Sequence, residues 1–324
     1  MRLRILSLVV VLAACSGSDA TAPTSITPTD PPASSTVATD APDTTSDSSV
    51  PDTSTTTTPL PPPDTTTTSQ PTEEILYEYW KGSFQYRDGL QIDVHAPDDR
   101  SNHPIAVMVH GGGWFTGRLD SMGHLADGLA ARGFVVFNAT YRTIARGGSF
   151  PGMVEDVACA VAYAREHALD YSTTANHFTL IGHSAGAHLS SLVTFSPSTF
   201  GQACPGGDAG VDAWVGLAGS YDTETYAFLL APLFGTPFAD DPALWSTGNP
   251  YTYVDAVDPS VELLFVHGDA DEIVPTSMTE NLYLAADLAG ASATLRILSG
   301  AGHGEVNSPR LVGDMIAELA TLDQ

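Results

Sequence analysis

Ser184 is the residue whose surroundings point most clearly to chemistry. It lies in the sequence Gly-His-Ser-Ala-Gly, residues 182–186, between an apolar run that ends at Ile181 and a stretch of small residues typical of a helix. A serine on a tight strand-to-helix turn leaves no room for side chains two positions away, so glycines on both sides fit such a turn. The N–H groups that open the helix would face the oxygen of an attacked carbonyl. The pattern therefore predicts a nucleophilic serine.

A glycine-rich loop supplies a second part of the same chemistry. Residues 110–114, His-Gly-Gly-Gly-Trp, follow the apolar run 105–109, which is typical of a buried strand. Glycines leave backbone N–H groups uncovered, and such a loop is typical of an oxyanion hole. The predicted donors are the N–H groups of Gly112 or Gly113 and of Ala185. A phosphate-binding loop fits poorly, because neither Gly-Lys-Ser/Thr nor the Gly-x-Gly-x-x-Gly spacing is present.

A nucleophilic serine needs a general base and an acid that orients the base, and both should come later in the chain. His303 lies among glycines just after a predicted strand, 294–298, so it is free to reach across the edge of a sheet. Residues 267–275, His-Gly-Asp-Ala-Asp-Glu-Ile-Val-Pro, follow another apolar run and offer two acids, Asp269 and Asp271. Either acid is a candidate partner for His303 at this point.

The elements that must position these residues alternate between strand and helix. We expect a hairpin at 84–86 and 90–95, then strands at 105–109, 134–138, 178–181, 213–217, 261–266 and 294–298. Helices are expected between them, namely one that ends at 132, one over 151–168, one after Ser184, and others near 278–288 and 311–322. The alternation predicts an α/β fold with a mostly parallel sheet and helices on both faces. Active groups then gather at the carboxyl ends of the strands.

Four motifs in this order resemble the α/β-hydrolase superfamily over residues 75–324. The likeness is greatest to carboxylesterases with a His-Gly-Gly-Gly-Trp loop and a Gly-His-Ser-Ala-Gly-Ala-His-Leu elbow, including feruloyl-esterase-like, hormone-sensitive-lipase-like and kynurenine-formamidase-like enzymes. The resemblance implies an α/β-hydrolase fold with Ser184 as nucleophile and His303 as general base. It also selects Asp271, because these families place the acid three residues before a Val-Pro pair. His183 is a departure, since many hormone-sensitive-lipase-like members carry Asp there.

The resemblance implies a serine hydrolase that cleaves small-molecule carboxylic esters through an acyl-enzyme intermediate. Amidase, formamidase or peptidase chemistry on the same fold is an alternative, and so is a non-enzymatic lipoprotein that binds a ligand. No cofactor and no metal are expected, because no Cys/His cluster has metal-ligand spacing. Asp269 is expected to hydrogen-bond its own turn rather than His303.

Residues 220–260 are long for a connection between strands and rich in aromatic side chains. We interpret them either as a small lid-like insertion beside the substrate pocket or as an excursion packed on the scaffold. Trp114 and Tyr221 are the candidate contacts with substrate.

The N-terminus predicts export. Residues 1–15 combine a basic start, an apolar stretch and Leu-Ala-Ala-Cys, which resembles a bacterial lipoprotein signal that ends in a lipidated Cys15. An ordinary secretory signal is the alternative. Residues 16–72 are rich in Ser, Thr and Pro and should form a disordered linker, which leaves 73–324 as the catalytic domain. The protein is thus expected outside the cytoplasm, held to the cell membrane by lipid.

The net charge limits the possible partners, and the cysteine content fits export. The formal net charge of −26 makes nucleic acid an unsuitable partner. Beyond Cys15 the chain has Cys159 and Cys204, and an even pair in an oxidising compartment indicates a disulfide. In the α/β-hydrolase fold the helices near these cysteines pack on the same face of the sheet, so the resemblance makes the bridge sterically feasible. Two separate buried thiols are the alternative.

Overall fold

The computed structural model describes residues 76–204, 207–225 and 227–320. The predicted signal (1–15) with Cys15 and the predicted linker (16–72) lie outside the described residues. Within the described ranges, no helix has the length and apolar content needed to cross a bilayer.

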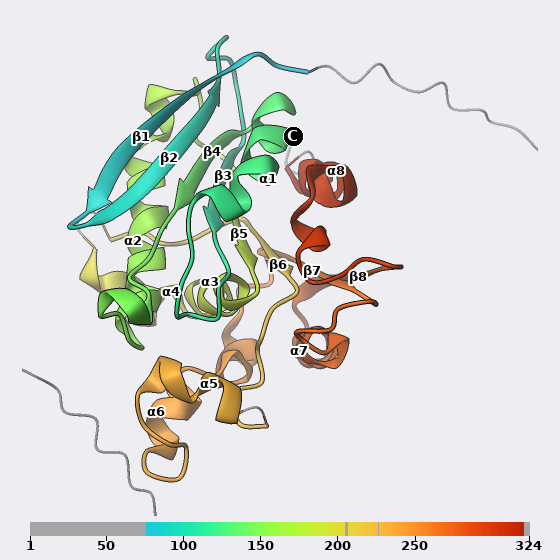
Figure 1. Cartoon of the computed structure of the whole chain (residues 1–324). Coiled ribbons are helices and arrows are strands. Elements are labelled where there is room, and N and C mark those ends of the chain that lie inside the picture. The colour runs from blue at the N-terminus through green and yellow to red at the C-terminus, as the bar shows by residue number, and fades with distance from the viewer. Residues whose placement is uncertain (1–75, 205–206, 226, 321–324) are drawn as a thin grey trace, which may run out of the picture. The chain divides into compact units, whose positions relative to one another are not determined.

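An eight-stranded sheet organises the described residues (Figure 1). Its strands are β1 Tyr79–Arg87, β2 Leu90–Pro97, β3 Ile105–Val109, β4 Val135–Ala139, β5 Phe178–His183, β6 Ala213–Leu217, β7 Glu262–Gly268 and β8 Ser292–Leu298. Their order across the sheet is β1-β2-β4-β3-β5-β6-β7-β8. The hairpin β1–β2 is antiparallel and β2 pairs antiparallel with β4, whereas all other neighbours are parallel. The predicted mostly parallel α/β sheet is confirmed.

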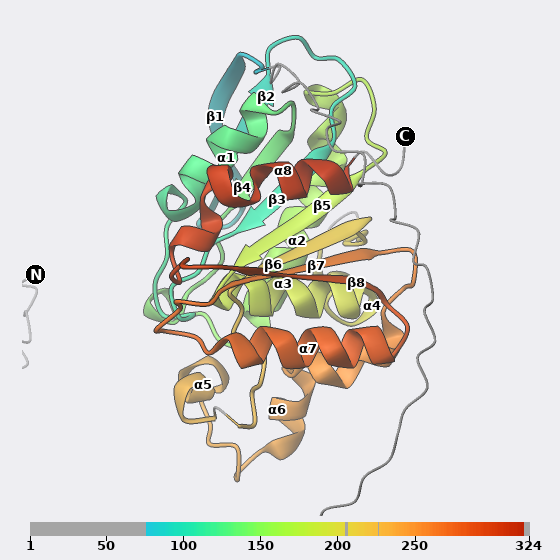
Figure 2. The same cartoon turned by 90° about the vertical axis from the view of Figure 1, so that its right-hand side faces the viewer.

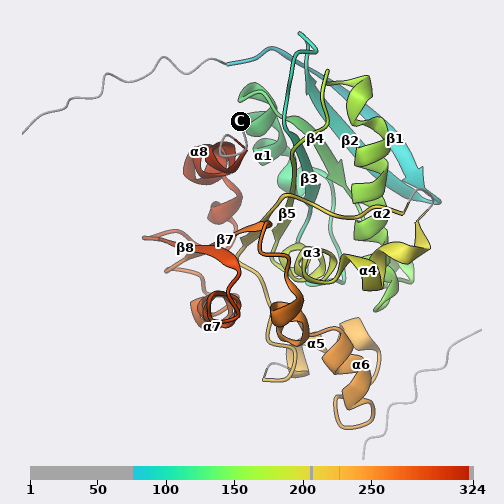
Figure 3. The same cartoon turned by 180° about the vertical axis from the view of Figure 1, so that it is seen from behind.

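The central strands are almost completely buried and mainly apolar, because both of their faces are covered. Along β3 the side chains alternate, so that Ile105, Val107 and Val109 join one hydrophobic cluster and Ala106 and Met108 join the other. The helices α1 Asp120–Ala131 and α8 Pro309–Leu319 cover the Met108 face, whereas α2 Gly152–His167, α3 Ala185–Phe195 and α7 Thr276–Leu288 cover the opposite face. Figures 2 and 3 show the two helical layers on either side of the sheet.

The parallel register brings the predicted motifs to one edge of the sheet. Val109 lies beside Gly182, so the glycine-rich loop and the serine elbow leave the sheet at the same level. Gly268 lies beside Leu298, so the loops that carry Asp271 and His303 also leave together. The fold therefore gathers the four motifs at the carboxyl ends of the strands.

The stretch 220–260 forms a small helical insertion. It contains α5 Ala227–Phe234, α6 Pro242–Thr247 and the 3₁₀ helix η4 Pro250–Ala256, and it lies beyond α3 and α4 (Pro197–Phe200) in Figure 1. The ring of Phe234 stacks on Trp245 with centroids 4.2 Å apart and also contacts Phe150. His188 on α3 donates from Nε2 to the carbonyl of Gly248 at 2.8 Å. These contacts hold the insertion against the scaffold.

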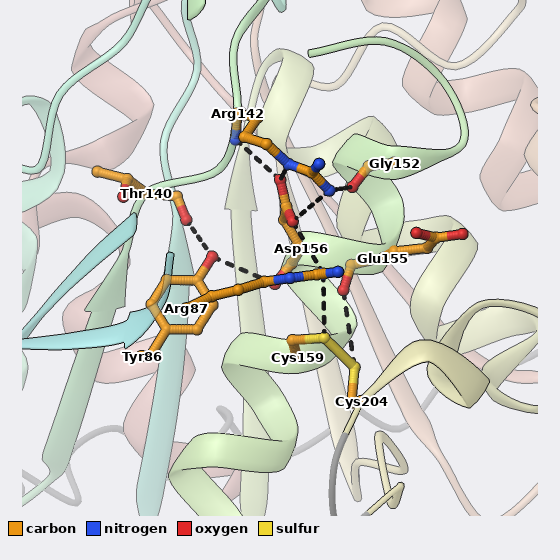
Figure 4. Close-up of a disulfide and its surroundings, with 9 residues drawn as sticks. All are labelled: Tyr86, Arg87, Thr140, Arg142, Gly152, Glu155, Asp156, Cys159 and Cys204. Carbon is orange, nitrogen blue, oxygen red and sulfur yellow. Dashed lines mark hydrogen bonds and ion pairs between the residues drawn. A yellow bond between two sulfur atoms is a disulfide. The ribbon is translucent and has the colours of Figure 1, made fainter. Parts of the chain in front are cut away.

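Cys159 and Cys204 form a disulfide that joins α2 to the segment after α4 (Figure 4). One turn before Cys159 on α2, the fully buried carboxylate of Asp156 accepts from Arg142 Nε at 2.7 Å and from Arg87 Nη1 at 3.0 Å. Two guanidinium groups thus compensate the burial of one carboxylate. The disulfide fastens α2 to the segment after α4, and the Asp156 cluster fastens it to β1 and to the connection after β4.

We expect this disulfide to stabilise the domain. The bond closes a loop of 45 residues, for which the chain-entropy model gives about 4 kcal/mol before any strain. The Cys159→Ser and Cys204→Ser double variant should therefore have a lower free energy of unfolding in urea than the oxidised wild type. Mass analysis of the purified protein without reductant should find no free thiol at either position, and two free thiols would contradict the bridge.

Candidate active site

Ser184 lies on a sharp turn between β5 and α3. Its backbone has φ of +54°, in a region that non-glycine residues rarely adopt, and its N–H donates to the Leu217 carbonyl at 2.8 Å. A Cβ on Gly182 would collide with the carbonyl of Gly186, and a Cβ on Gly186 would collide with that of Val109. The two glycines therefore permit the turn, and the turn presents the serine at the end of the strand.

The glycine-rich loop curls beside this turn. Gly112, Gly113 and Trp114 all have positive φ, at +118°, +60° and +60°. A hydrogen bond from another segment stabilises the loop: the Ile144 N–H donates to the Trp114 carbonyl at 2.9 Å. Among the hydrogen bonds of the described residues, none is donated by the backbone N–H of Gly112, Gly113 or Ala185. These groups are thus uncommitted, as the predicted oxyanion hole requires.

Asp271 and His303 form the central polar contact of the site. His303 Nδ1 lies 2.7 Å from Asp271 Oδ2, and the other carboxylate oxygen accepts the N–H groups of Ile273 at 2.8 Å and Val274 at 2.9 Å. Burial alone would raise the pKa of Asp271, but the Val274 N–H and the His303 imidazole outweigh it and lower the pKa. An ionised Asp271 accepts the proton on Nδ1, so Nε2 of His303 keeps its lone pair and can act as a base.

The elbow, the glycine-rich loop and the His303 loop line one cavity of about 790 Å³. Ser184, His303, Gly112, Gly113 and Trp114 all contribute to its wall. Three predicted parts of the site, the nucleophile, the base and the oxyanion loop, therefore meet around one space. The acid lies directly behind the base.

Asp269 points elsewhere. Its carboxylate accepts the N–H of Gly300 at 2.6 Å, in the loop that follows β8. The expectation that Asp269 would bond its own turn was wrong, because the loop after β7 runs beside the loop after β8 and offers a nearer donor. The two acids of the motif thus have separate partners.

Tyr221 does not lie at this cavity. Its side chain is fully buried against Trp214 and Phe265, with ring centroids 6.1 Å and 6.5 Å away. The prediction of a substrate contact at Tyr221 was wrong because the chain turns inward after Ser220. Ser220 itself lines the cavity, and it is the only described residue of the 220–260 stretch that does so. The insertion therefore borders the cavity at one point and otherwise packs against the scaffold.

Two further histidines support the site, and sequence reasoning gave neither a role. His183 Nε2 lies 2.8 Å from the His303 carbonyl, to which it must donate. Burial lowers the pKa of His183 to about 4, so the ring is neutral near pH 7 and carries one N–H. An ionised aspartate, which has no donor, could not make this contact.

The second histidine is His267, the penultimate residue of β7. Its ring is completely buried, and its Nε2 lies 3.0 Å from Asp271 Oδ2. The signal in the sequence was a histidine at the end of a buried strand, four residues before the acid. Within the described ranges, no group of three or more His, Cys, Asp or Glu side chains is placed to hold a metal ion.

The amino-acid sequence is similar to those of curated esterases. The chain is 26% identical over 238 residues to Esterase LipQ of Mycobacterium tuberculosis, covering 70% of this chain and 55% of the relative. It is 28% identical over 215 residues to Esterase LipC of the same organism, covering 62% and 53%. The chain thus spans about half the length of the curated relatives it matches.

Solved structures share the fold at lower identity. A truncated carbohydrate esterase from gut microbiota superposes with a TM-score of 0.65 at 22% identity, covering 77% of this chain and 98% of that one. A thermophilic esterase from Thermogutta terrifontis with bound butyrate gives 0.63 at 20% identity, covering 75% and 94%. The model of the BD-FAE family matches residues 92–285, a range that contains the glycine-rich loop, the elbow and Asp271. The chain therefore belongs to the BD-FAE family and has the α/β-hydrolase fold.

Proposed function

We propose that this protein is a serine hydrolase that cleaves carboxylic esters with Ser184, His303 and Asp271 as its catalytic triad. The observation that carries the proposal is the Asp271–His303 hydrogen bond of 2.7 Å behind a cavity that Ser184 also lines. The relatives from Mycobacterium tuberculosis are named as esterases, which supports the same reaction class.

Each residue has a defined part in the proposed reaction. His303 Nε2 accepts the proton of the Ser184 hydroxyl while the serine oxygen bonds to the ester carbonyl carbon. The carbonyl oxygen becomes an oxyanion, which accepts hydrogen bonds from the N–H of Gly112 or Gly113 and of Ala185. His303 then gives its proton to the leaving alcohol, and water repeats the sequence to release the acid and restore the serine.

A chromogenic assay tests the activity. The purified domain should release p-nitrophenol from p-nitrophenyl acetate, and a serine-directed phosphonate should abolish the release and add its mass to the peptide that contains Ser184. A panel of aryl esters of increasing acyl length, with matched anilides and a formamide, should show turnover of the esters. Faster cleavage of the amide or formamide members would assign a different reaction to the same residues.

We propose further that the protein is exported and held to the membrane through lipid on Cys15. The support is the Leu-Ala-Ala-Cys sequence after a basic and apolar segment, followed by a linker too poor in apolar residues to form a core.

The Cys15→Ser variant should be found in the soluble exported fraction instead of the membrane fraction, because the Cys15 sulfur is the atom that would receive lipid. Immunoblots of fractionated cells measure the shift, with Ser16→Ala as the matched control that keeps the thiol. Unchanged membrane association of Cys15→Ser would point to a different anchor.

A further inference from the structure

His267 makes three polar contacts although its ring is completely buried. Its Nδ1 lies 2.7 Å from the hydroxyl of Thr279 on α7, and its Nε2 lies 3.0 Å from both the Val274 carbonyl and Asp271 Oδ2. A backbone carbonyl and a carboxylate oxygen only accept hydrogen bonds. Nε2 therefore carries a proton, which it donates to the Val274 carbonyl with Asp271 Oδ2 at the same distance, and Nδ1 accepts the proton of the Thr279 hydroxyl.

The ring is neutral in this arrangement, because burial lowers the pKa of His267. A neutral ring with its proton on Nε2 has no lone pair directed at Asp271. His267 thus presents an N–H group to Asp271 Oδ2 at 3.0 Å and is not a competing base.

The contacts of Asp271 explain why a second donor matters. The N–H groups of Ile273 and Val274 bind its Oδ1. These two hydrogen bonds alone do not fix the position of the other oxygen, Oδ2. Its Oδ2 receives the proton on His303 Nδ1 at 2.7 Å. The donor on His267 reaches the same oxygen from the protein interior. Together the two contacts hold the plane of the carboxylate with Oδ2 directed at His303.

We propose that His267 is a positioning residue for the reaction, which acts through Asp271 by holding Oδ2 in line with His303. This inference rests on the proposed function. It predicts that losing the donor slows the chemical step and leaves substrate binding intact, because His267 does not line the cavity.

The test compares two substitutions of similar length. His267→Met fills the site without a donor, whereas His267→Gln places an amide N–H near the position of Nε2. His267→Met should lower kcat for p-nitrophenyl acetate about tenfold or more with KM unchanged, the size expected when a hydrogen bond to a charged group is lost. His267→Gln should recover most of that loss. If His267→Met does not fold, His267→Asn replaces it, because its shorter amide stops before Asp271.

A double-mutant cycle separates positioning from a general effect on the fold. In an Asp271→Asn background the carboxylate is gone, so His267→Met should change kcat by less than about twofold. An equal loss in both backgrounds, or a His267→Gln enzyme as slow as His267→Met, would overturn the inference. Failure of the proposed function looks different, because the wild type itself would then lack esterase activity or Asp271→Asn would retain it.

Discussion

Ser184→Ala should leave a folded domain whose esterase kcat has fallen by at least about 10³-fold. The substitution removes the atom that bonds to the carbonyl carbon and keeps the Cβ that the turn at φ +54° already accommodates. The backbone strain of the elbow is therefore the same before and after the change. Activity and stability should separate, with a large loss of kcat and little change in melting temperature.

Steady-state kinetics with p-nitrophenyl acetate measure the loss, and circular dichroism follows the melting. Ser83→Ala, at an exposed serine on β1, is the matched control and should keep wild-type kcat. The phosphonate should label the control and not Ser184→Ala. Wild-type activity in a purified Ser184→Ala preparation would reject the whole mechanism, since no other step in it replaces a covalent acyl-enzyme.

The strands that could be predicted best from the sequence are those buried on both faces. The ranges 105–109 and 213–217 coincide with β3 and β6, because a short continuous apolar run marks a central parallel strand. The first strand of the hairpin was predicted over 84–86 and extends over Tyr79–Arg87. Exposed and half-buried residues mix along this edge strand, so no apolar run marks its length.

The site could be predicted where its parts are local motifs and could not be where they are contacts between loops. The turn at Ser184 needs glycines within two residues, so the pentapeptide and its strand and helix flanks indicate it. Asp269 finds its partner at Gly300, and His183 finds its partner at His303, 120 residues away. Those pairings form because the loops after neighbouring strands run side by side. The course of these loops could not be predicted from the sequence. The prediction for Tyr221 was wrong for the same reason, since the burial of its side chain depends on the direction in which the chain leaves β6.

Asp271→Asn should cost the enzyme about 10⁴-fold in kcat, the size of the corresponding effect in a serine protease. The amide oxygen would take the place of Oδ1, where Ile273 and Val274 donate, and so its NH₂ group would face both imidazoles. His303 Nδ1 would then have to accept, which moves its proton to Nε2 and removes the lone pair that activates Ser184. His267 Nε2–H would also meet a donor in place of an acceptor.

Asp269→Asn is the matched control, since it makes the same chemical change two residues away. The Asp269 carboxylate accepts a hydrogen bond from the Gly300 N–H, and an asparagine side-chain oxygen can accept the same bond. Its effect should therefore fall mainly on stability, by about 1 kcal/mol or less, with kcat close to that of the wild type. Kinetics and urea unfolding of both variants decide the matter. If Asp269→Asn were the inactive enzyme, the acid would have been assigned to the wrong carboxylate, although Ser184 and His303 would keep their roles. If neither variant lost activity, His303 would need no acid, and the 2.7 Å contact behind it would be structural alone.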